Sequence, residues 1–123
     1  MFRRFLGSLT GPNPATMSAA QSKVMSIIAD NNVVVFSKSY CSYSRATKSL
    51  LNEQGIPFFV LELDQIEDGD AIQDALAEIS HQRTVPNIFI GQKHIGGNSD
   101  LQARKAELPA LLSAAAAAKA SKA

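Results

Sequence analysis

Three short apolar runs, separated by segments with helical periodicity, constrain the fold of this chain more than any other feature. The runs occupy residues 33–36, 58–61 and 87–90 and are rich in β-branched and aromatic side chains. Continuous apolar runs of this length are typical of strands buried on both faces, as in a sheet that helices cover. A fourth, shorter strand is expected at residues 94–95, after a hairpin-like turn at residues 91–93.

Apolar residues recur with a period near that of a helix between and around these runs. Helices are expected at residues 18–30, at 42–54, around 72–79, from Asn98 or Ser99 to about Lys105, and at 108–112. The first two strands and the helix between them form a right-handed parallel βαβ unit, and the last two strands form an antiparallel hairpin. The sequence therefore predicts an α/β fold with a small, mixed, four-stranded sheet and helices on both faces.

Length and composition indicate a single folded domain. The chain has 123 residues, of which 46% are hydrophobic and 19% charged, which is ordinary for a globular protein. We divide it into a disordered or transit segment at residues 1–17, a folded domain at 18–112 and an alanine-rich tail at 113–123. We expect the tail to be frayed, because alanine favours helix but buries little area.

The first residues differ in charge from the rest of the chain. Residues 1–29 contain three basic residues, two of them Arg3 and Arg4, and no acidic residue. An amphipathic, arginine-bearing start without acidic residues is typical of a mitochondrial or plastid transit segment. The alternative is a disordered tail or a remnant of cloning. Because Met17 could serve as a second start, we expect a cytoplasmic location, a mitochondrial location or both.

The overall charge and the single cysteine exclude several classes of function. A net charge of +1 supplies no bulk positive charge for nucleic-acid binding. No uninterrupted apolar run approaches the ~20 residues of a transmembrane helix. Cys41 is the only cysteine, which excludes an intrachain disulfide and a zinc site built from several thiolates of one chain. We therefore expect no nucleic-acid partner, no membrane partner and no metal site of this chain alone.

Cys41 is the candidate reactive residue. It lies between a predicted strand and the first turn of a predicted helix, where unpaired N–H groups and the helix dipole favour an anion. Lys38, Arg45 and Lys48 lie nearby in the sequence, and no acidic residue occurs between Asp30 and Glu53. These features predict a lowered thiol pKa and a nucleophilic thiolate. The alternative is an inert, buried cysteine.

Three motifs together resemble the glutaredoxin family. They are VVVFSKSYCSYSRATKSLL at residues 33–51, Thr84-Val85-Pro86, and IGGNSDL at residues 95–101, and their order and spacing match over about residues 18–112. The resemblance implies a thioredoxin fold, in which Pro86 is a cis-proline beside the thiol. Without the resemblance, Pro86 indicates only the start of a strand or a turn.

The resemblance implies that Cys41 is the catalytic nucleophile. Ser44 stands where dithiol members have a second cysteine, and Ser42 stands where many members have proline, so that the motif is C-S-Y-S. A serine cannot resolve a disulfide, whether it is native or introduced. The motif is therefore that of a monothiol variant of a C-P-Y-C-type member.

The resemblance also implies a glutathione site. Its residues are Lys38, Tyr43, Gln73, Thr84, Val85, Pro86, Gly97, Ser99 and Asp100. Lys38 and Gln73 would hold the glycine carboxylate, Thr84 and Val85 the cysteinyl backbone, and residues 97–100 the γ-glutamyl end. Lys38 and Arg45 would also stabilise the thiolate.

Several of these residues have a purely structural alternative. Gln73 has the spacing to complete a capping box with Asp70. Ser99 or Asp100 could only cap a helix, and Lys38 could only be solvated. His94 lies in a predicted strand with no partner evident from the sequence, and we assign it a structural role.

The function implied is that of a glutathione-dependent thiol–disulfide oxidoreductase that reduces protein–glutathione mixed disulfides through Cys41. Its partners would be glutathione, as co-substrate, and glutathionylated proteins, and we expect a monomer. The main alternative is a [2Fe–2S] cluster held between two chains by Cys41 and glutathione, although the chain lacks the C-G-F-S motif of dedicated cluster carriers. A third possibility is a non-catalytic interaction module with a thioredoxin fold.

Overall fold

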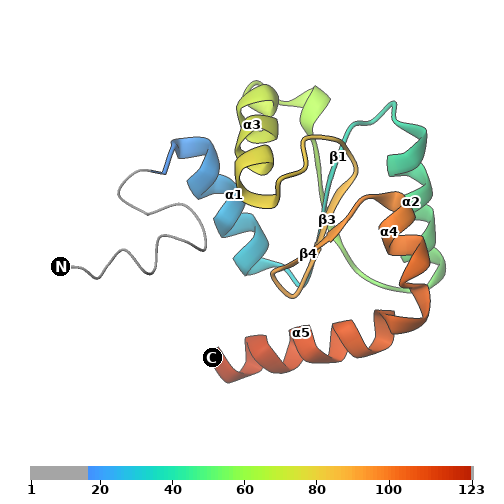
Figure 1. Ribbon diagram of the computed structural model, residues 1–123. Coiled ribbons are helices and arrows are strands. Elements are labelled where there is room, and N and C mark those ends of the chain that lie inside the picture. Colours follow the sequence, from blue (N-terminus) through green and yellow to red (C-terminus); the bar gives the residue numbers. More distant parts are fainter. Residues whose placement is uncertain (1–16, 123) are drawn as a thin grey trace.

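The computed structural model describes residues 17–122, in which helices and strands alternate along the chain (Figure 1). The elements in order are α1 (Ala19–Asp30), β1 (Val33–Ser37), α2 (Ser42–Glu53), β2 (Phe59–Glu62), η3 (Leu63–Gln65), α3 (Gly69–Ser80), β3 (Asn87–Ile90), β4 (Lys93–Gly96), α4 (Asn98–Ala103), η4 (Lys105–Glu107) and α5 (Leu108–Lys122). The proposed transit segment at residues 1–16 lies outside the described residues. Among residues 17–122, no helix is long and apolar enough to cross a membrane.

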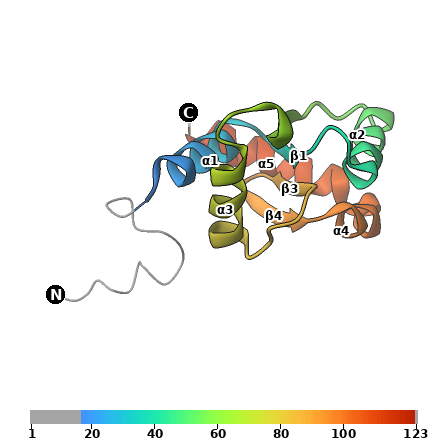
Figure 2. The same cartoon turned by 90° about the horizontal axis from the view of Figure 1, so that it is seen from above.

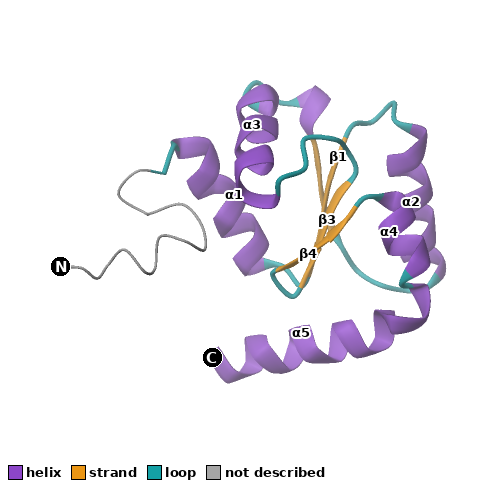
Figure 3. Ribbon diagram, viewed as in Figure 1, coloured by secondary structure: helices purple, strands orange, loops and turns teal. Residues whose placement is uncertain are grey.

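The four strands form one mixed sheet in the order β2-β1-β3-β4. Figure 3 shows the strands, in orange, between the helices. β1 pairs in parallel with β2, whereas β3 pairs antiparallel with both β1 and β4. Gly91 and Gln92 connect β3 to β4, and both have positive φ, as a tight two-residue hairpin turn requires. The predicted βαβ unit, hairpin and four-stranded mixed sheet are confirmed.

Helices cover both faces of the sheet, and the alternation of side chains along β1 assigns each residue to one face (Figure 2). Val33 and Val35 pack in a cluster with residues of α2, α4 and α5. Val34 and Phe36 pack in a second cluster with residues of α1 and α3. Since burying a side chain of this size contributes ~1.5–3 kcal/mol, these two clusters fix the position of β1 and of the loop that follows it.

β2 is less buried than the sequence analysis expected. It is an edge strand, and Phe59 on it is 38% exposed, while Val60 and Leu61 are half-buried. A run of apolar residues does not reveal whether its strand is central or at the edge of the sheet. That depends on the strand order, which decides whether the strand has a neighbour on both sides.

The C-terminal helix is longer than expected. α5 runs without a break to Lys122, so Leu112 does not mark the end of regular structure. Ala115 is buried, and its Cβ lies where a side chain at Gly91 would have to be. The small size of both residues lets α5 pack closely on the β3–β4 turn, which stabilises a segment that alanine composition alone would leave frayed.

Candidate functional site

Cys41 is the N-cap residue of α2. Its backbone is extended, with φ −84° and ψ 123°, and its carbonyl oxygen accepts the N–H of Arg45 at 3.0 Å. Its own N–H donates to the carbonyl oxygen of Lys38 at 3.0 Å, which closes the turn between β1 and α2. An N-cap side chain faces the N–H groups of the second and third helical residues, here Tyr43 and Ser44. The thiol therefore occupies the position at which a helix binds an anion.

The pKa of the Cys41 thiol is held below its usual value. Partial burial opposes ionisation, but the backbone N–H and the hydroxyl of Ser44, the backbone N–H of Tyr43 and the charge of Arg45 together outweigh it. The predicted lowering of the thiol pKa is confirmed in direction. Its main cause is hydrogen bonding at the start of α2, and a neighbouring cation contributes less.

Ser44 supplies a hydroxyl in place of a second thiol. Its side chain is fully buried, and its Oγ has no hydrogen-bond partner among the described residues. A neutral thiol is a weak acceptor, whereas a thiolate is a strong one, so the Ser44 hydroxyl gains a partner when Cys41 loses its proton. The sequence analysis treated Ser44 only as a missing cysteine and did not assign it this part in lowering the thiol pKa.

The three lysine and arginine side chains expected around Cys41 have different partners. Arg45 acts on the thiolate. Lys48 instead forms an ion pair with Glu62 of β2, with 2.7 Å between Nζ and Oε2. The charge of Lys38 helps to lower the pKa of the Asp64 carboxyl, after the larger contributions of the Ser39 hydroxyl and backbone N–H. Neither Lys38 nor Lys48 is among the groups that lower the pKa of Cys41. Their expected contribution to the thiolate is therefore corrected, because Lys48 is paired with Glu62 and the charge of Lys38 acts on Asp64.

Asp64 anchors the loop that carries Cys41. Its carboxylate accepts hydrogen bonds from the Ser39 N–H, at 2.9 Å, and from the Ser39 hydroxyl. Asp64 belongs to the short helix η3, which directly follows β2. The loop after β1 is thus tied to the segment after the neighbouring parallel strand.

The segment at residues 82–86 lies beside the thiol. The Val85–Pro86 peptide bond is cis, as the resemblance implied. The Cys41 Sγ lies 3.9 Å from the Val85 carbonyl oxygen, a long contact suited to a weak S–H donor. Thr84 is exposed, Val85 half-buried and Pro86 buried. The backbone of Val85 is therefore placed directly against the reactive group.

Side chains satisfy the carbonyl oxygens of this irregular segment, as backbone groups outside regular structure require. The Gln73 carboxamide donates to the Arg83 oxygen at 2.8 Å, and the Gln82 carboxamide donates to the oxygens of Thr84 and Pro86 at 3.1 and 3.0 Å. The expected capping box of Asp70 and Gln73 is wrong, because α3 begins at Gly69, its N-cap residue is Asp68, and Gln73 bonds to Arg83. The sequence analysis missed Gln82, whose only signal was its place two residues before Thr84.

The loop at residues 97–100 borders the same segment. A Cβ built on Gly97 would meet the Pro86 carbonyl oxygen at 3.6 Å. Asp100 Oδ2 accepts the Gly97 N–H at 2.9 Å, so the N-cap residue of α4 is Gly97 rather than Asn98 or Ser99. Ser99 is exposed in the first turn of α4, which ends at Ala103 rather than near Lys105.

His94 has a structural partner that the sequence did not reveal. Its Nε2 lies 2.9 Å from Asn87 Oδ1, and its ring lies against Phe89. Because the Asn87 amide donates to Ser80 Oγ and to the Gln82 carbonyl oxygen, its Oδ1 must accept from His94. Burial lowers the pKa of His94 more than the charge of Asp100 raises it, and the expected structural role agrees with these contacts.

Contacts among the described residues connect several of the expected site residues to Cys41, directly or through one another. Val85 contacts Cys41, Pro86 adjoins Gly97, and Asp100 holds Gly97. Tyr43 is 66% exposed in the first turn of α2, and Lys38 is half-buried at the start of the Cys41 loop. Gln73 reaches only the backbone next to Thr84. The site is an open surface beside Cys41, bounded by the cis-proline segment and the start of α4.

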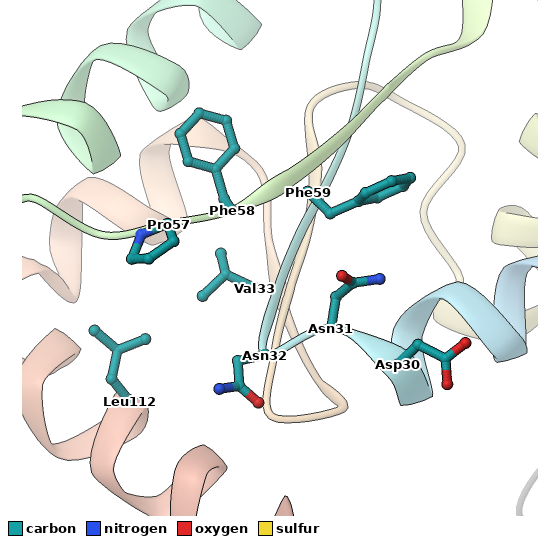
Figure 4. A pocket seen from close by; sticks show the side chains of 8 residues that line it. All are labelled: Asp30, Asn31, Asn32, Val33, Pro57, Phe58, Phe59 and Leu112. Atoms are coloured by element: carbon teal, nitrogen blue, oxygen red, sulfur yellow. The ribbon is translucent and has the colours of Figure 1, made fainter.

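The described residues also line cavities away from Cys41. One, of about 390 Å³, lies between the end of α1, the segment before β2 and α5; among its residues are Asn32, Phe58 and Leu112 (Figure 4). It adjoins the N-terminal end of β1, whereas Cys41 follows the C-terminal end. Within residues 17–122, no group of three His, Cys, Asp or Glu side chains could hold a metal ion.

Comparison with known proteins identifies one family. The glutaredoxin family model matches residues 33–95. A glutaredoxin of Vernicia fordii is 54% identical over 78 residues, which are 63% of this chain and 75% of the relative. The monothiol glutaredoxin-S10 of Oryza sativa subsp. japonica is 43% identical over 109 residues, which are 86% of this chain and 66% of the relative.

A solved structure agrees with these matches. The crystal structure of a buckwheat glutaredoxin–glutathione complex is 40% identical to this chain and superimposes with a TM-score of 0.78. The superposition covers 85% of this chain and 97% of the buckwheat protein. The mixed sheet with its flanking helices is therefore the thioredoxin fold of glutaredoxins. The chain belongs to the glutaredoxin family, and is a thiol–disulfide oxidoreductase.

Proposed function

We propose that this protein reduces glutathione mixed disulfides by a monothiol mechanism with Cys41 as nucleophile. The observation that carries the proposal is the thiol at the N-cap position of α2, with a lowered pKa and a serine in place of a resolving cysteine. The buckwheat relative binds glutathione, and the rice relative is named a monothiol glutaredoxin. The first relative supports glutathione as the substrate group, and the second supports the monothiol mechanism.

The reaction consists of two thiol–disulfide exchanges. In the first, the Cys41 thiolate attacks the glutathionyl sulfur of the mixed disulfide, a Cys41–glutathione disulfide forms, and the substrate leaves as a thiolate that takes a proton. In the second, the thiolate of another glutathione attacks the glutathionyl sulfur on Cys41. Oxidised glutathione is released and the Cys41 thiolate returns, stabilised again by the Ser44 hydroxyl and the N–H groups of α2.

The tripeptide would lie along the open surface beside Cys41. The Val85 N–H and carbonyl group would pair with its cysteinyl backbone, as a peptide adds to the edge of a sheet. Lys38 and the second N–H of the Gln73 carboxamide would bind the glycine carboxylate. Gly97, Ser99 and Asp100 would receive the γ-glutamyl end, where Asp100 has a carboxylate for the ammonium group, while Tyr43 would flank the sulfur atoms.

The assignment is tested by turnover of a glutathionylated peptide with glutathione. We expect Cys41→Ser to abolish turnover, and Ser42→Ala, which removes an exposed hydroxyl next to the nucleophile, to retain most of it. Mass spectrometry should show one glutathione bound to Cys41 of the wild-type protein after the first exchange. Appreciable turnover by the Cys41→Ser variant would contradict the assignment.

The cluster-binding alternative makes a different prediction. This chain has one cysteine, so a [2Fe–2S] cluster with four thiolate ligands would need two chains and two external thiols. We expect protein purified without oxygen to be a colourless monomer with full oxidoreductase activity. A brown dimer whose visible absorption disappears in the Cys41→Ser variant would favour the alternative.

A further inference from the structure

The Gln82 side chain lies against the cis-proline segment and joins two of its residues. Its Nε2 donates to the Thr84 carbonyl oxygen at 3.1 Å and to the Pro86 carbonyl oxygen at 3.0 Å. Both acceptors are carbonyl groups, so only the NH₂ end of the carboxamide can make these bonds, and both of its hydrogens are used. A single side chain therefore fixes the residue before and the residue after Val85.

The carbonyl groups of this segment point to different partners. Those of Thr84 and Pro86 point to Gln82, whereas that of Val85 points to Cys41. Gln82 thus holds the side of the segment away from the thiol and leaves the Val85 backbone facing the thiol. This is the backbone that the proposed function pairs with the cysteinyl unit of glutathione.

Gln82 is itself held in place by two polar side chains, Ser80, which is half-buried, and Asn87, which is buried. Its N–H donates to Ser80 Oγ at 3.3 Å, and its carbonyl oxygen accepts from Asn87 Nδ2 at 3.1 Å. Asn87 is fully buried and also donates to Ser80 Oγ. The carboxamide of Gln82 therefore extends from a backbone position that two further side chains fix, as a positioning residue requires.

We propose that Gln82 is a positioning residue for glutathione, which holds the Val85 backbone ready to pair with the tripeptide. The proposal rests on the proposed function and adds to it a residue whose side chain bonds to the backbone on either side of Val85 rather than to the thiol. Without the two hydrogen bonds, the carbonyl groups of Thr84 and Pro86 would turn to water, and the segment would have to be ordered at the moment of binding. Preorganisation removes that entropic cost.

The test compares a disulfide that contains the tripeptide with a disulfide that does not. The rate constant for the reaction of Cys41 is measured with oxidised glutathione and with 2-hydroxyethyl disulfide, and their ratio gives the preference for glutathione. We expect Gln82→Met, which keeps the length of the side chain but removes both donors, to lower this ratio about tenfold, which equals ~1.4 kcal/mol. The alkylation rate of Cys41 by iodoacetamide should stay unchanged.

Two further variants serve as a control for the substitution and as a second test of Gln82. Gln54→Met makes the same change at an exposed position at the far end of α2, and it should leave the ratio as in the wild type. Gln82→Asn keeps a neutral carboxamide but is shorter by one methylene group, so it cannot reach both carbonyl groups. It should also lower the ratio, and it serves as the test if Gln82→Met does not fold.

Each outcome has one meaning. A wild-type protein with no preference for oxidised glutathione would overturn the proposed function itself. A wild-type preference that both Gln82 variants keep would overturn the role of Gln82 alone. Equal slowing with both disulfides, or slower alkylation, would also overturn it, because Gln82 would then support the thiol or the fold rather than the tripeptide site.

Discussion

At the scale of single residues, the chemistry depends on the N-cap position of Cys41. A thiolate there replaces the oxygen with which serine, threonine or aspartate usually caps a helix. Two backbone N–H groups and one hydroxyl then act on the sulfur, while the formal charge of Arg45 contributes least among the groups that lower its pKa. The pKa of Cys41 should therefore depend only weakly on salt, because hydrogen bonds are screened less than exposed charges.

Ser44 gives the sharpest prediction at this scale. We expect Ser44→Ala to move the pH midpoint of Cys41 alkylation upward, because the thiolate loses a hydrogen-bond donor. Below the midpoint, the alkylation rate should fall about three- to tenfold. Ser49→Ala, at an exposed position of the same helix, is the control and should leave the midpoint unchanged. An unchanged midpoint in Ser44→Ala would show that the hydroxyl does not act on the thiolate.

The same variant should alter the pH dependence of stability. The thiol pKa is lower in the folded than in the unfolded chain, so folding favours the thiolate. This contribution is fully present above the unfolded value of ~8.5 and is lost as the pH falls through the folded value. Denaturant unfolding should therefore show a rise in stability between these two pH values, and the rise should be smaller in Ser44→Ala.

At the scale of secondary-structure elements, polar side chains tie the site-bearing elements together. Asp64 joins the segment after β2 to the Cys41 loop, and the Thr47 hydroxyl of α2 donates to Asn98 Oδ1 of α4 at 3.0 Å. Lys48 of α2 pairs with Glu62 of β2. These contacts set the position of the first turn of α2 relative to the residues proposed to bind the tripeptide.

The Lys48–Glu62 pair predicts a loss of stability without a change in chemistry. Both side chains are less than 25% exposed, and Glu62 Oε1 has no hydrogen-bond partner among the described residues. We expect Lys48→Met to lower the free energy of unfolding by about 1–2 kcal/mol, because it leaves a partly buried carboxylate unpaired. The alkylation midpoint of Cys41 should not move. Lys48→Met combined with Glu62→Gln should recover part of the stability. If it does not, the unpaired Glu62 carboxylate is not the cause of the loss.

At the scale of the whole molecule, the reactive cysteine and the C-terminal helix α5 lie at opposite ends of the sheet. Cys41 follows the C-terminal end of β1, whereas α5 packs on the β3–β4 turn near the N-terminal end, where the Gly91 N–H donates to the Asn32 carbonyl oxygen. The loop between β1 and α2 lies at one end of the strands, and α5 runs across the other end (Figure 1). A change in α5 should therefore alter the stability of the protein but have little effect on the reactivity of Cys41.

Removal of residues 113–123 tests this separation. The truncated protein loses the buried Ala115, and we expect its free energy of unfolding to fall by about 1 kcal/mol, in line with the small area that an alanine buries. Turnover of the glutathionylated peptide should be unchanged at temperatures where the protein stays folded. Removal of residues 119–123 alone, which keeps Ala115, is the control. Equal stability of the two truncated forms would show that Ala115 contributes nothing.

Much of the fold could be predicted because its signals are local. The runs around Val35 and Ile88 and the helical periodicity around Leu76 appear within a few residues of sequence, and the structure confirms their elements. The exposure of Phe59 and the burial of Ala115 could not be predicted, because each depends on a neighbour far along the chain. Local periodicity records which side of an element is apolar but not what covers it.

The sequence by itself determined the reactive group: one cysteine, a serine three residues later, a loop without acidic residues and a helix to follow, because helix capping acts over a single turn. The tertiary structure alone decided which nearby charges are paired elsewhere and which distant groups lie beside that cysteine. It paired Lys48 with Glu62, turned Gln73 and Gln82 to the carbonyl groups of the cis-proline segment, and placed Val85 against the sulfur. Hydrogen bonds and ion pairs act over a few ångströms, and only the folded chain brings residues as far apart in sequence as Cys41 and Val85 within that range.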